Sequence, residues 1–428
     1  MKKVVKKVAL LLIVFGIGVG VTLLYTNNKY KVYDEEEPKQ IMKHVDTISM
    51  MIETEAKSGN YEMTTRSEWP TEGYVFNSKL SKCENGGELS WDDTNKKVLM
   101  SGNVSDKCYV YFDIYVPPTV VSDVCNGGET LSTCITTLSQ NSTSSYTNIY
   151  HHDSALANGA GDNSYRYAGA NPNNFVCFGT NTTPCPTDNL YRIIGVFGNQ
   201  VKLIKYDYAT SALLGTDGDY KGTGTPNASY YKGSLTTINT YYWNKATSKN
   251  TWSESNLNKV NLNTNFINNI RSEWAAKIAE TTWKVGGNTF ANIGTQPAKT
   301  AYQNEIVSPV TTNTTDGATE YSAKIGLMYV SDYMYAASQD KWTLVGNGSA
   351  TTDYRAATSV NWMYMGFGDW TISRIADNSS SVFGMYSTGY VDYGYVGGNS
   401  GCRPSFSLLS STTYVSGSGS ASDPMVIN

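Results

Sequence analysis

The fold is decided by Leu190-Tyr-Arg-Ile-Ile-Gly-Val-Phe197, Gly198-Asn199 and Gln200-Val-Lys-Leu-Ile-Lys205. Two runs rich in β-branched and aromatic residues flank a two-residue Gly-Asn turn, which predicts a β-hairpin. A further apolar run, Ser405 to Leu409, predicts a late strand. Around this hairpin we expect the large domain, residues 146–428.

Helical signals are few in this domain. Apolar residues recur every four positions, which predicts one amphipathic helix that Asn263 or Thr264 can cap. A second unit reads as a strand over Lys324 to Val330, with Ser331 capping a helix behind it. We therefore expect an α+β domain with short strands, few helices and long loops. The residues of the first helical stripe are Leu262, Phe266, Ile270, Trp274 and Ile278.

The chain before the large domain predicts a smaller one. Short strand-like runs separated by Asn-Gly and Asp-Asp turns over residues 43–116 indicate a small β-sandwich. Residues 117–145 are rich in Ser and Thr and read as a linker with one short disulfide loop. The expected strands are Thr47–Glu53, Gly73–Phe76, Glu88–Trp91, Lys97–Ser101 and Cys108–Val116.

The N-terminus carries lysines followed by an uninterrupted apolar run from Val8 to Tyr25. Such a run can cross a bilayer core of about 30 Å, and flanking lysines keep that end in the cytoplasm. We predict a transmembrane signal anchor at residues 1–28 and a polar stalk at 29–42, which makes this a single-pass membrane protein with an extracellular bulk. A cleavable signal peptide is the alternative, but no small-residue cleavage site ends the run.

Composition narrows the class of partner. Charged residues make up 16 % of the chain, against roughly 25 % in typical globular proteins, and tyrosine alone contributes 32 residues. Removing the four N-terminal lysines from a net charge of −4 leaves roughly −8 for the rest. A nucleic-acid partner is excluded because no basic surface could neutralise phosphates.

Six of the seven cysteines form near pairs: Cys83 with Cys108, Cys125 with Cys134, and Cys177 with Cys185. In an exported chain these predict three disulfides. Metal binding is the rival interpretation, but the chain lacks a C-x-x-C pair. Cys402 reads as a buried apolar residue.

The large domain also resembles a known family. Its hairpin, the Trp252-Ser-Glu-Ser-Asn-Leu257 block, Ile325-Gly-Leu-Met-Tyr-Val-Ser-Asp-Tyr333, Asp369-Trp-Thr-Ile-Ser-Arg374 and Gly401-Cys-Arg-Pro-Ser-Phe406 occur in the family's order. On these segments residues 146–428 are similar to the bacterial exported family called domain of unknown function 6273, in which valine usually stands at the position of Cys402.

The resemblance implies an exported bacterial protein but carries no established activity. Its closing strands are similar in style to the C-type-lectin-like fold that formylglycine-generating enzymes share. That likeness is an analogy, and a fold does not fix a function.

The most suggestive chemistry is aromatic. In Tyr386-Ser-Thr-Gly-Tyr390-Val-Asp-Tyr393-Gly-Tyr395, alternate residues share one strand face. Tyrosine offers a rigid ring and a hydroxyl, which suit sugar faces and protein surfaces. We expect Trp370 and Phe383 in the core, and Arg403 as a buried partner of a carboxylate. The predicted ligand-binding residues are Tyr386, Tyr390, Asp392, Tyr393 and Tyr395.

Signals for catalysis or metals are weak. Asp153, Asp162 and Asn163 lie in one Gly-rich loop and could hold Ca²⁺, although Asx turns explain them equally well. No other cofactor is expected. His151 and His152 read as surface-loop residues, and the sequence lacks the common hydrolase and nucleotide-binding signatures.

These features favour a membrane-anchored, non-enzymatic surface protein that binds a glycan or another protein. The alternatives are a cell-wall or glycan-processing enzyme, which needs paired carboxylates in a cleft, and a structural envelope component.

Overall fold

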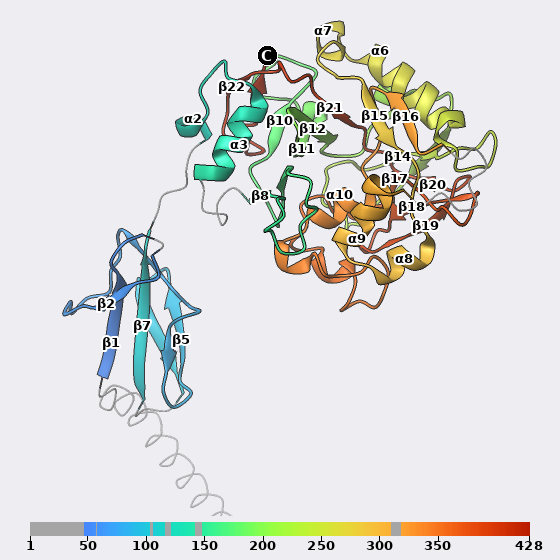
Figure 1. Ribbon diagram of the computed structural model, residues 1–428. Coiled ribbons are helices and arrows are strands. Elements are labelled where there is room, and N and C mark those ends of the chain that lie inside the picture. The colour runs from blue at the N-terminus through green and yellow to red at the C-terminus, as the bar shows by residue number, and fades with distance from the viewer. Residues whose placement is uncertain (1–46, 57, 103–105, 116–120, 142–147, 310–317) are drawn as a thin grey trace, which may run out of the picture. The chain divides into compact units, whose positions relative to one another are not determined.

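The computed structural model describes residues 47–56, 58–102, 106–115, 121–141, 148–309 and 318–428 (Figure 1). The chain divides into two compact units, Met1–Pro118 and Thr119–Asn428. Most of the described chain is strand and loop, and its helices are short.

The first unit is a five-stranded sheet with a separate hairpin. The sheet order is β2-β1-β7-β3, with β4 also paired to β7, and β1 runs parallel to β7. Trp91 of the hairpin packs edge-on against Phe112 of β7, with ring centroids 5.7 Å apart, so the hairpin covers one face of the sheet. The strands are β1 (Thr47–Glu53), β2 (Tyr61–Met63), β3 (Tyr74–Phe76), β4 (Lys82–Cys83), β5 (Glu88–Asp92), β6 (Lys97–Ser101) and β7 (Lys107–Ile114).

The second unit is built from several small antiparallel sheets around one apolar core. Its strands are β8 (Ile149–His151), β9 (Tyr165–Tyr167), β10 (Phe175–Cys177), β11 (Leu190–Phe197), β12 (Gln200–Lys205), β13 (Tyr220–Gly224), β14 (Ile238–Tyr242), β15 (Thr281–Lys284), β16 (Glu320–Ala323), β17 (Asp369–Arg374), β18 (Ser381–Met385), β19 (Val391–Tyr395), β20 (Asn399–Ser400), β21 (Ser405–Ser407), β22 (Tyr414–Ser416) and β23 (Val426–Ile427).

Short helices connect these strands. They are α2 (Val121–Val124), α3 (Leu131–Asn141), η1 (Thr187–Asn189), α5 (Ser211–Leu214), η2 (Trp252–Glu254), the π-helix η3 (Leu257–Phe266), α6 (Ile267–Asn269), α7 (Ser272–Ala275), α8 (Phe290–Thr295), α9 (Ala298–Tyr302), the π-helix η4 (Gln303–Val307), α10 (Val330–Tyr335), η5 (Gln339–Lys341) and η6 (Tyr354–Ala357).

The predicted hairpin is confirmed as β11 and β12, with Phe197 opposite Gln200 and Gly198 at a φ of 62°. It lies at the centre of a six-stranded sheet of order β21-β12-β11-β9-β8, with β10 on β11. The predicted late strand is β21, which pairs with β12. Nearly every residue of β11 and β12 is buried, because the sheet is covered on both faces.

The predicted fold class is wrong. The expected α+β architecture is replaced by sheets and loops with few helices, and α3, at 11 residues, is the longest α-helix among the described residues. Within the residues that the structure describes, no helix is long and apolar enough to cross a membrane. The anchor predicted at residues 1–28 and the stalk at 29–42 lie outside the described residues.

The amphipathic helix expected over 262–278 is not one helix. The chain forms η3 and α6, becomes extended at Ile270 and resumes as α7. Asparagine side chains tie this segment to remote carbonyls: within η3, Asn261 Nδ2 donates to Leu214 at 2.8 Å, and at the break Asn269 Nδ2 donates to Leu213 at 3.0 Å. The apolar spacing nevertheless buries Trp274.

The strand expected over 324–330 is also absent, apart from a single bridge between Gly326 and Ser405. The N-cap of the helix behind it lies two residues before the predicted cap at Ser331. Tyr329 is the N-cap of α10, and its backbone N–H donates to Asp332 Oδ2 at 2.9 Å. That carboxylate lies at the positive end of the helix.

Residues 121–141, expected within a linker at 117–145, belong to the second unit. α2 and α3 bury Leu131 and Ile135 in its core, and Figure 1 shows both helices beside β22. A bridge from Thr130 to Thr413 fixes this contact between distant parts of the chain.

Candidate functional site: an aromatic groove

A groove of about 440 Å³ opens in the second unit. Strands β18 and β19, the segments before β17 and β20, and the distant loop at 225–227 surround it. The lining residues are Thr225, Asn227, Phe367, Gly368, Trp370, Gly384, Met385, Tyr386, Ser387, Gly394, Tyr395, Gly398, Asn399 and Ser400.

The floor of this aromatic groove depends on Trp370. Its ring is 4 % exposed, and its indole N–H donates to the Tyr241 carbonyl at 2.8 Å. A Cβ atom on Gly394 would lie 2.7 Å from the Trp370 ring, so a larger residue there would collide with the floor. Glycine at this position of β19 therefore keeps the groove open above a fixed indole.

Tyrosines form its walls. Tyr386 is 41 % exposed and Tyr395 50 %, although large aromatic side chains are usually well covered. The ring of Tyr386 stacks on that of Tyr390, with centroids 4.9 Å apart and an interplanar angle of 22°. The ring of Tyr386 is therefore an aromatic surface held in place by a neighbouring ring.

Neutral polar groups complete the lining. The side chains of Thr225, Ser387, Tyr395 and Asn399 make no hydrogen bond within the part of the chain that the structure describes. None of the lining residues is charged. The groove thus offers aromatic faces together with hydroxyl and amide groups that are free to bond to a ligand.

The predicted ligand residues divide into two groups. Tyr386 and Tyr395 line the groove. Tyr390 lies behind Tyr386 with the Arg355 guanidinium 4.8 Å from its ring centroid, and Tyr393 packs edge-on against Phe290. Asp392 bonds to the backbone N–H of Tyr393.

Sequence reasoning missed Thr225, Asn227 and Asn399. The first two lie more than a hundred residues before the aromatic stretch, and no local pattern connects them with it. Asn399 follows two glycines directly after the tyrosines, and that proximity was the one available signal. The expectation that Trp370 and Phe383 are core residues is confirmed, since both are buried.

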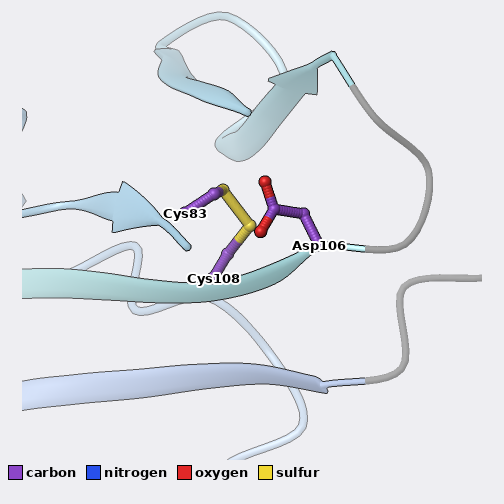
Figure 2. Close-up of side chains that lie close together, drawn as sticks. All are labelled: Cys83, Asp106 and Cys108. Atoms are coloured by element: carbon purple, nitrogen blue, oxygen red, sulfur yellow. A yellow bond between two sulfur atoms is a disulfide. The ribbon is translucent and has the colours of Figure 1, made fainter. Parts of the chain in front are cut away.

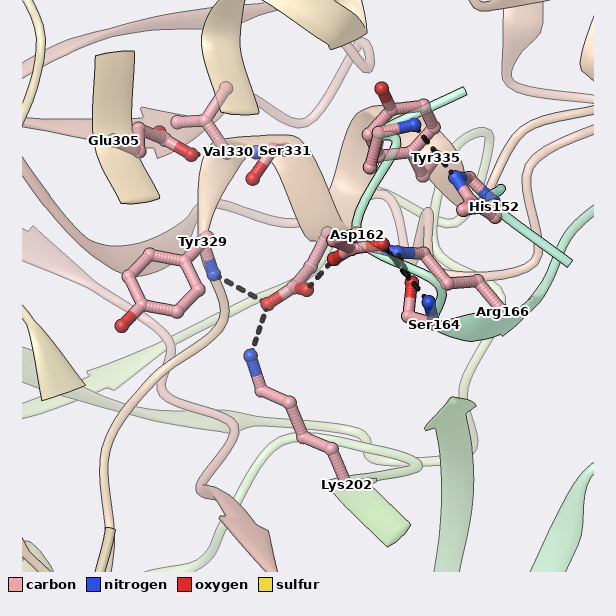
Figure 3. A network of polar contacts seen from close by, with 12 residues as sticks. His152, Asp162, Ser164, Arg166, Lys202, Glu305, Tyr329, Val330, Ser331 and Tyr335 are labelled. Atoms are coloured by element: carbon pink, nitrogen blue, oxygen red, sulfur yellow. Dashed lines mark hydrogen bonds and ion pairs between the residues drawn. The ribbon is translucent and has the colours of Figure 1, made fainter. Parts of the chain in front are cut away.

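A second cavity, of about 240 Å³, contains an ionic network instead. Lys202 Nζ donates to Asp332 Oδ2 at 2.6 Å, and Arg166 donates to Asp162 at 2.6 Å. Figure 3 shows Lys202 pointing from β12 towards the start of α10, and Arg166 beside Asp162 and Ser164. We call these four charged residues the ionic network.

Burial and charge compete in this network. Burial alone would raise the pKa of Asp162, but the charge of Arg166 and hydrogen bonds from Ser164 lower it to about 2. Burial lowers the pKa of Lys202, and the charge of Asp332 opposes that shift. Nearby, burial raises the pKa of Glu305 to about 7.

The residues of the calcium hypothesis are engaged within the protein. Asp162 bonds to Ser164 and Arg166, and Asp153 Oδ1 accepts the backbone N–H groups of Ala155 and Leu156. Asn163 adopts a φ of 57° in the same loop. Among the described residues, Asp153 and Asp162 belong to no group of three His, Cys, Asp or Glu side chains arranged to hold a metal.

Two other clusters have that arrangement, but both contain disulfides. In the first, Asp106 lies beside the bonded sulfurs of Cys83 and Cys108 (Figure 2). Its carboxylate accepts the backbone N–H groups of Asn85 and Gly87. The second cluster joins Glu129 to the Cys125–Cys134 bond. The sulfurs are therefore not thiolate ligands.

All three predicted disulfides are confirmed, including Cys177–Cys185. Cys402 is free and fully buried. Arg403 has the expected carboxylate partner, since its Nε donates to Asp369 at 2.5 Å.

The interpretation of His152 as a surface residue is wrong. It is fully buried, its Nδ1 accepts the Ala160 N–H at 3.0 Å, and it packs against Tyr335 and Trp342. Burial, with the nearby charge of Arg166, lowers its pKa to about 2. This neutral imidazole is a core group, whereas His151 is half-exposed and stacks on Tyr165.

Comparison with known proteins adds no relative, because no family model, curated protein or solved structure matches this chain.

Proposed function

We propose that this chain is a non-enzymatic binding protein that recognises a glycan in the aromatic groove. The observation that carries the proposal is the combination of exposed Tyr386 and Tyr395 with uncommitted neutral polar side chains above Trp370. Sugar rings present C–H faces that stack on aromatic rings, and hydroxyls that bond to amides and hydroxyls. An uncharged lining favours an uncharged sugar.

A protein ligand is the alternative partner. The concave form favours the glycan, because protein partners commonly bind over larger and flatter areas. The backbone amide groups of an extended peptide could also bond to the hydroxyl and amide groups of the groove. The test below therefore includes peptides.

The disulfides support an exported protein, which would meet glycans at the cell surface. Three disulfides lie within the described residues, and such bonds persist in oxidising compartments outside the cytosol. The extracellular location and membership of the family called domain of unknown function 6273 remain predictions.

An enzyme has less support. No carboxylate lines the groove, and glycoside hydrolysis ordinarily needs two. In the second cavity Asp162 and Asp332 are paired with Arg166 and Lys202. The Arg166 charge lowers the pKa of Asp162 to about 2, and an ionised carboxylate cannot act as the general acid.

The test is an array of neutral glycans, cell-wall fragments and peptides probed with the purified full chain, with calcium and with a chelator. We expect specific binding to a neutral glycan that is lost in the double variant Tyr386→Ala/Tyr395→Ala. Binding to peptides alone would overturn the glycan assignment, and turnover of a bound glycan would overturn the non-enzymatic one. Chelator sensitivity would revive the calcium hypothesis.

A further inference from the structure

Lys202 and Asp332 are held together far from water. Their side chains are 8 % and 3 % exposed, and Nζ lies 2.6 Å from Oδ2. One residue lies in β12 and the other in the first turn of α10, 130 positions apart in the sequence. The fold thus holds an amine and a carboxyl group in direct contact, which removes the entropic cost of bringing them together.

Aromatic rings enclose the amine. Nζ is 4.5 Å from the ring centroid of Tyr329, 5.4 Å from that of Trp283 and 5.7 Å from that of Phe197. Asp332 is its sole hydrogen-bond acceptor among the described residues. Few groups compete for the amine, and burial lowers its pKa, which favours the nucleophilic neutral form.

Two further groups contact the carboxyl oxygens of Asp332. The Tyr329 N–H donates to Oδ2 at 2.9 Å, and Arg166 Nη1 lies 4.0 Å from Oδ1. Both groups can stabilise negative charge that develops on the carboxyl oxygens during attack on the carbon. The amide keeps one of the two carboxyl oxygens, so one of these contacts persists in the product.

A third buried group can carry a proton. Glu305 is 1 % exposed, its Oε2 accepts the Ser331 N–H at 3.1 Å, and its Oε1 has no hydrogen-bond partner. It interacts electrostatically with both Lys202 and Asp332. With a pKa of about 7, its carboxyl exchanges protons readily near neutral pH.

We propose that Lys202 and Asp332 condense into an intramolecular amide that joins β12 to α10. The bond from Nζ to the carboxyl carbon forms as one carbon–oxygen bond breaks. The ammonium loses two protons, which leave with that oxygen as water, so total charge is conserved and no oxidant or cofactor is required.

Burial favours this product. Two charges taken out of water carry a large desolvation penalty that their attraction offsets only in part. The amide removes both charges, and the released water enters bulk solvent. It also closes a long loop covalently, which restricts the unfolded chain as a disulfide does.

The test is the mass of the folded full chain. We expect an intact mass one water below that of the sequence with three disulfides. After trypsin, residues 193–205 and 325–341 should appear as one linked species, because an amidated Lys202 is not cleaved. An unshifted mass with a free peptide ending at Lys202 would overturn the proposal.

Lys202→Arg is the matched control, because it keeps the positive charge but cannot form this amide under the same conditions. It should show no loss of water. A loss of the same size in this variant would place the condensation elsewhere and contradict the assignment. The tryptic map of the unmodified sequence decides the matter even where the variant fails to fold.

Discussion

The aromatic groove and the ionic network lie in the same unit and use their side chains in opposite ways. In the groove, Tyr395 is 50 % exposed and its hydroxyl is uncommitted. In the network, Lys202 and Asp332 are buried and bonded to each other. The difference teaches that an uncommitted polar group beside an exposed ring indicates binding, whereas two buried groups in direct contact indicate a link between elements of the fold.

The largest expected effect is on the network. Lys202→Met should lower the free energy of unfolding by about 3–5 kcal/mol, because it leaves the Asp332 carboxylate buried without its main partner. A double variant with Asp332→Leu should recover part of that loss. Urea unfolding measures both, and a change in the single variant below about 1 kcal/mol would show that the pair contributes little.

The pH dependence of stability tests a buried carboxyl group near the ionic network, that of Glu305. An unfolded glutamate ionises near pH 4.5 and Glu305 near about 7, so the native state holds the extra proton between these values. The contribution of Glu305 to stability should therefore fall as pH rises through this window, by up to about 3 kcal/mol. Glu305→Gln should remove this decline.

His152 changes stability with the opposite sign. The native pKa of His152, about 2, lies below the ordinary 6.5. The contribution of His152 to stability is therefore lost progressively as the pH falls below 6.5. His152 is present both in the unmodified protein and in the Glu305→Gln variant. The difference between their curves of stability against pH therefore isolates the contribution of Glu305. Parallel curves for the two proteins would contradict the buried, protonated carboxyl.

In the groove, Tyr395→Ala should weaken glycan binding by about 1–3 kcal/mol, because an aromatic stacking face is lost. Its stability should change by no more than about 0.5 kcal/mol. Tyr393→Ala is the matched control, since Tyr393 is on the same strand and 49 % exposed but does not line the groove. Calorimetric titration measures the glycan affinity of both variants. Equal losses of affinity would refute the assignment of Tyr395, but not Tyr393, to the lining of the groove.

The smallest expected effect is that of Asn399→Ala. It removes one uncommitted amide and should weaken binding by about 0.5–1.5 kcal/mol, the net value of one hydrogen bond. The same titration measures it. An unchanged affinity would move the polar contacts to Thr225 or Ser387.

Local patterns predicted local structure well. The hairpin of β11 and β12, strands such as β6, the three disulfides and the burial of Trp370 follow from turn chemistry, alternation and cysteine spacing. Each depends on residues that are near in sequence.

Contacts between distant residues could not be predicted. The four-residue spacing of Leu262 to Ile278 indicated one helix, but the chain becomes extended at Ile270, where the adjacent Asn269 bonds to the remote Leu213 carbonyl. His152 was assigned to the surface because nothing in its loop revealed Trp342 above it. The Lys202–Asp332 pair and the loop at 225–227 depend in the same way on tertiary structure.

The most direct test of glycan recognition is a crystal structure of the full chain with the glycan that binds best on the array. We predict a sugar ring above Trp370, between Tyr386 and Tyr395, with Asn399 bonded to a hydroxyl. A glycan seated in the Lys202 cavity, or elsewhere on the molecule with the groove empty, would contradict the assignment.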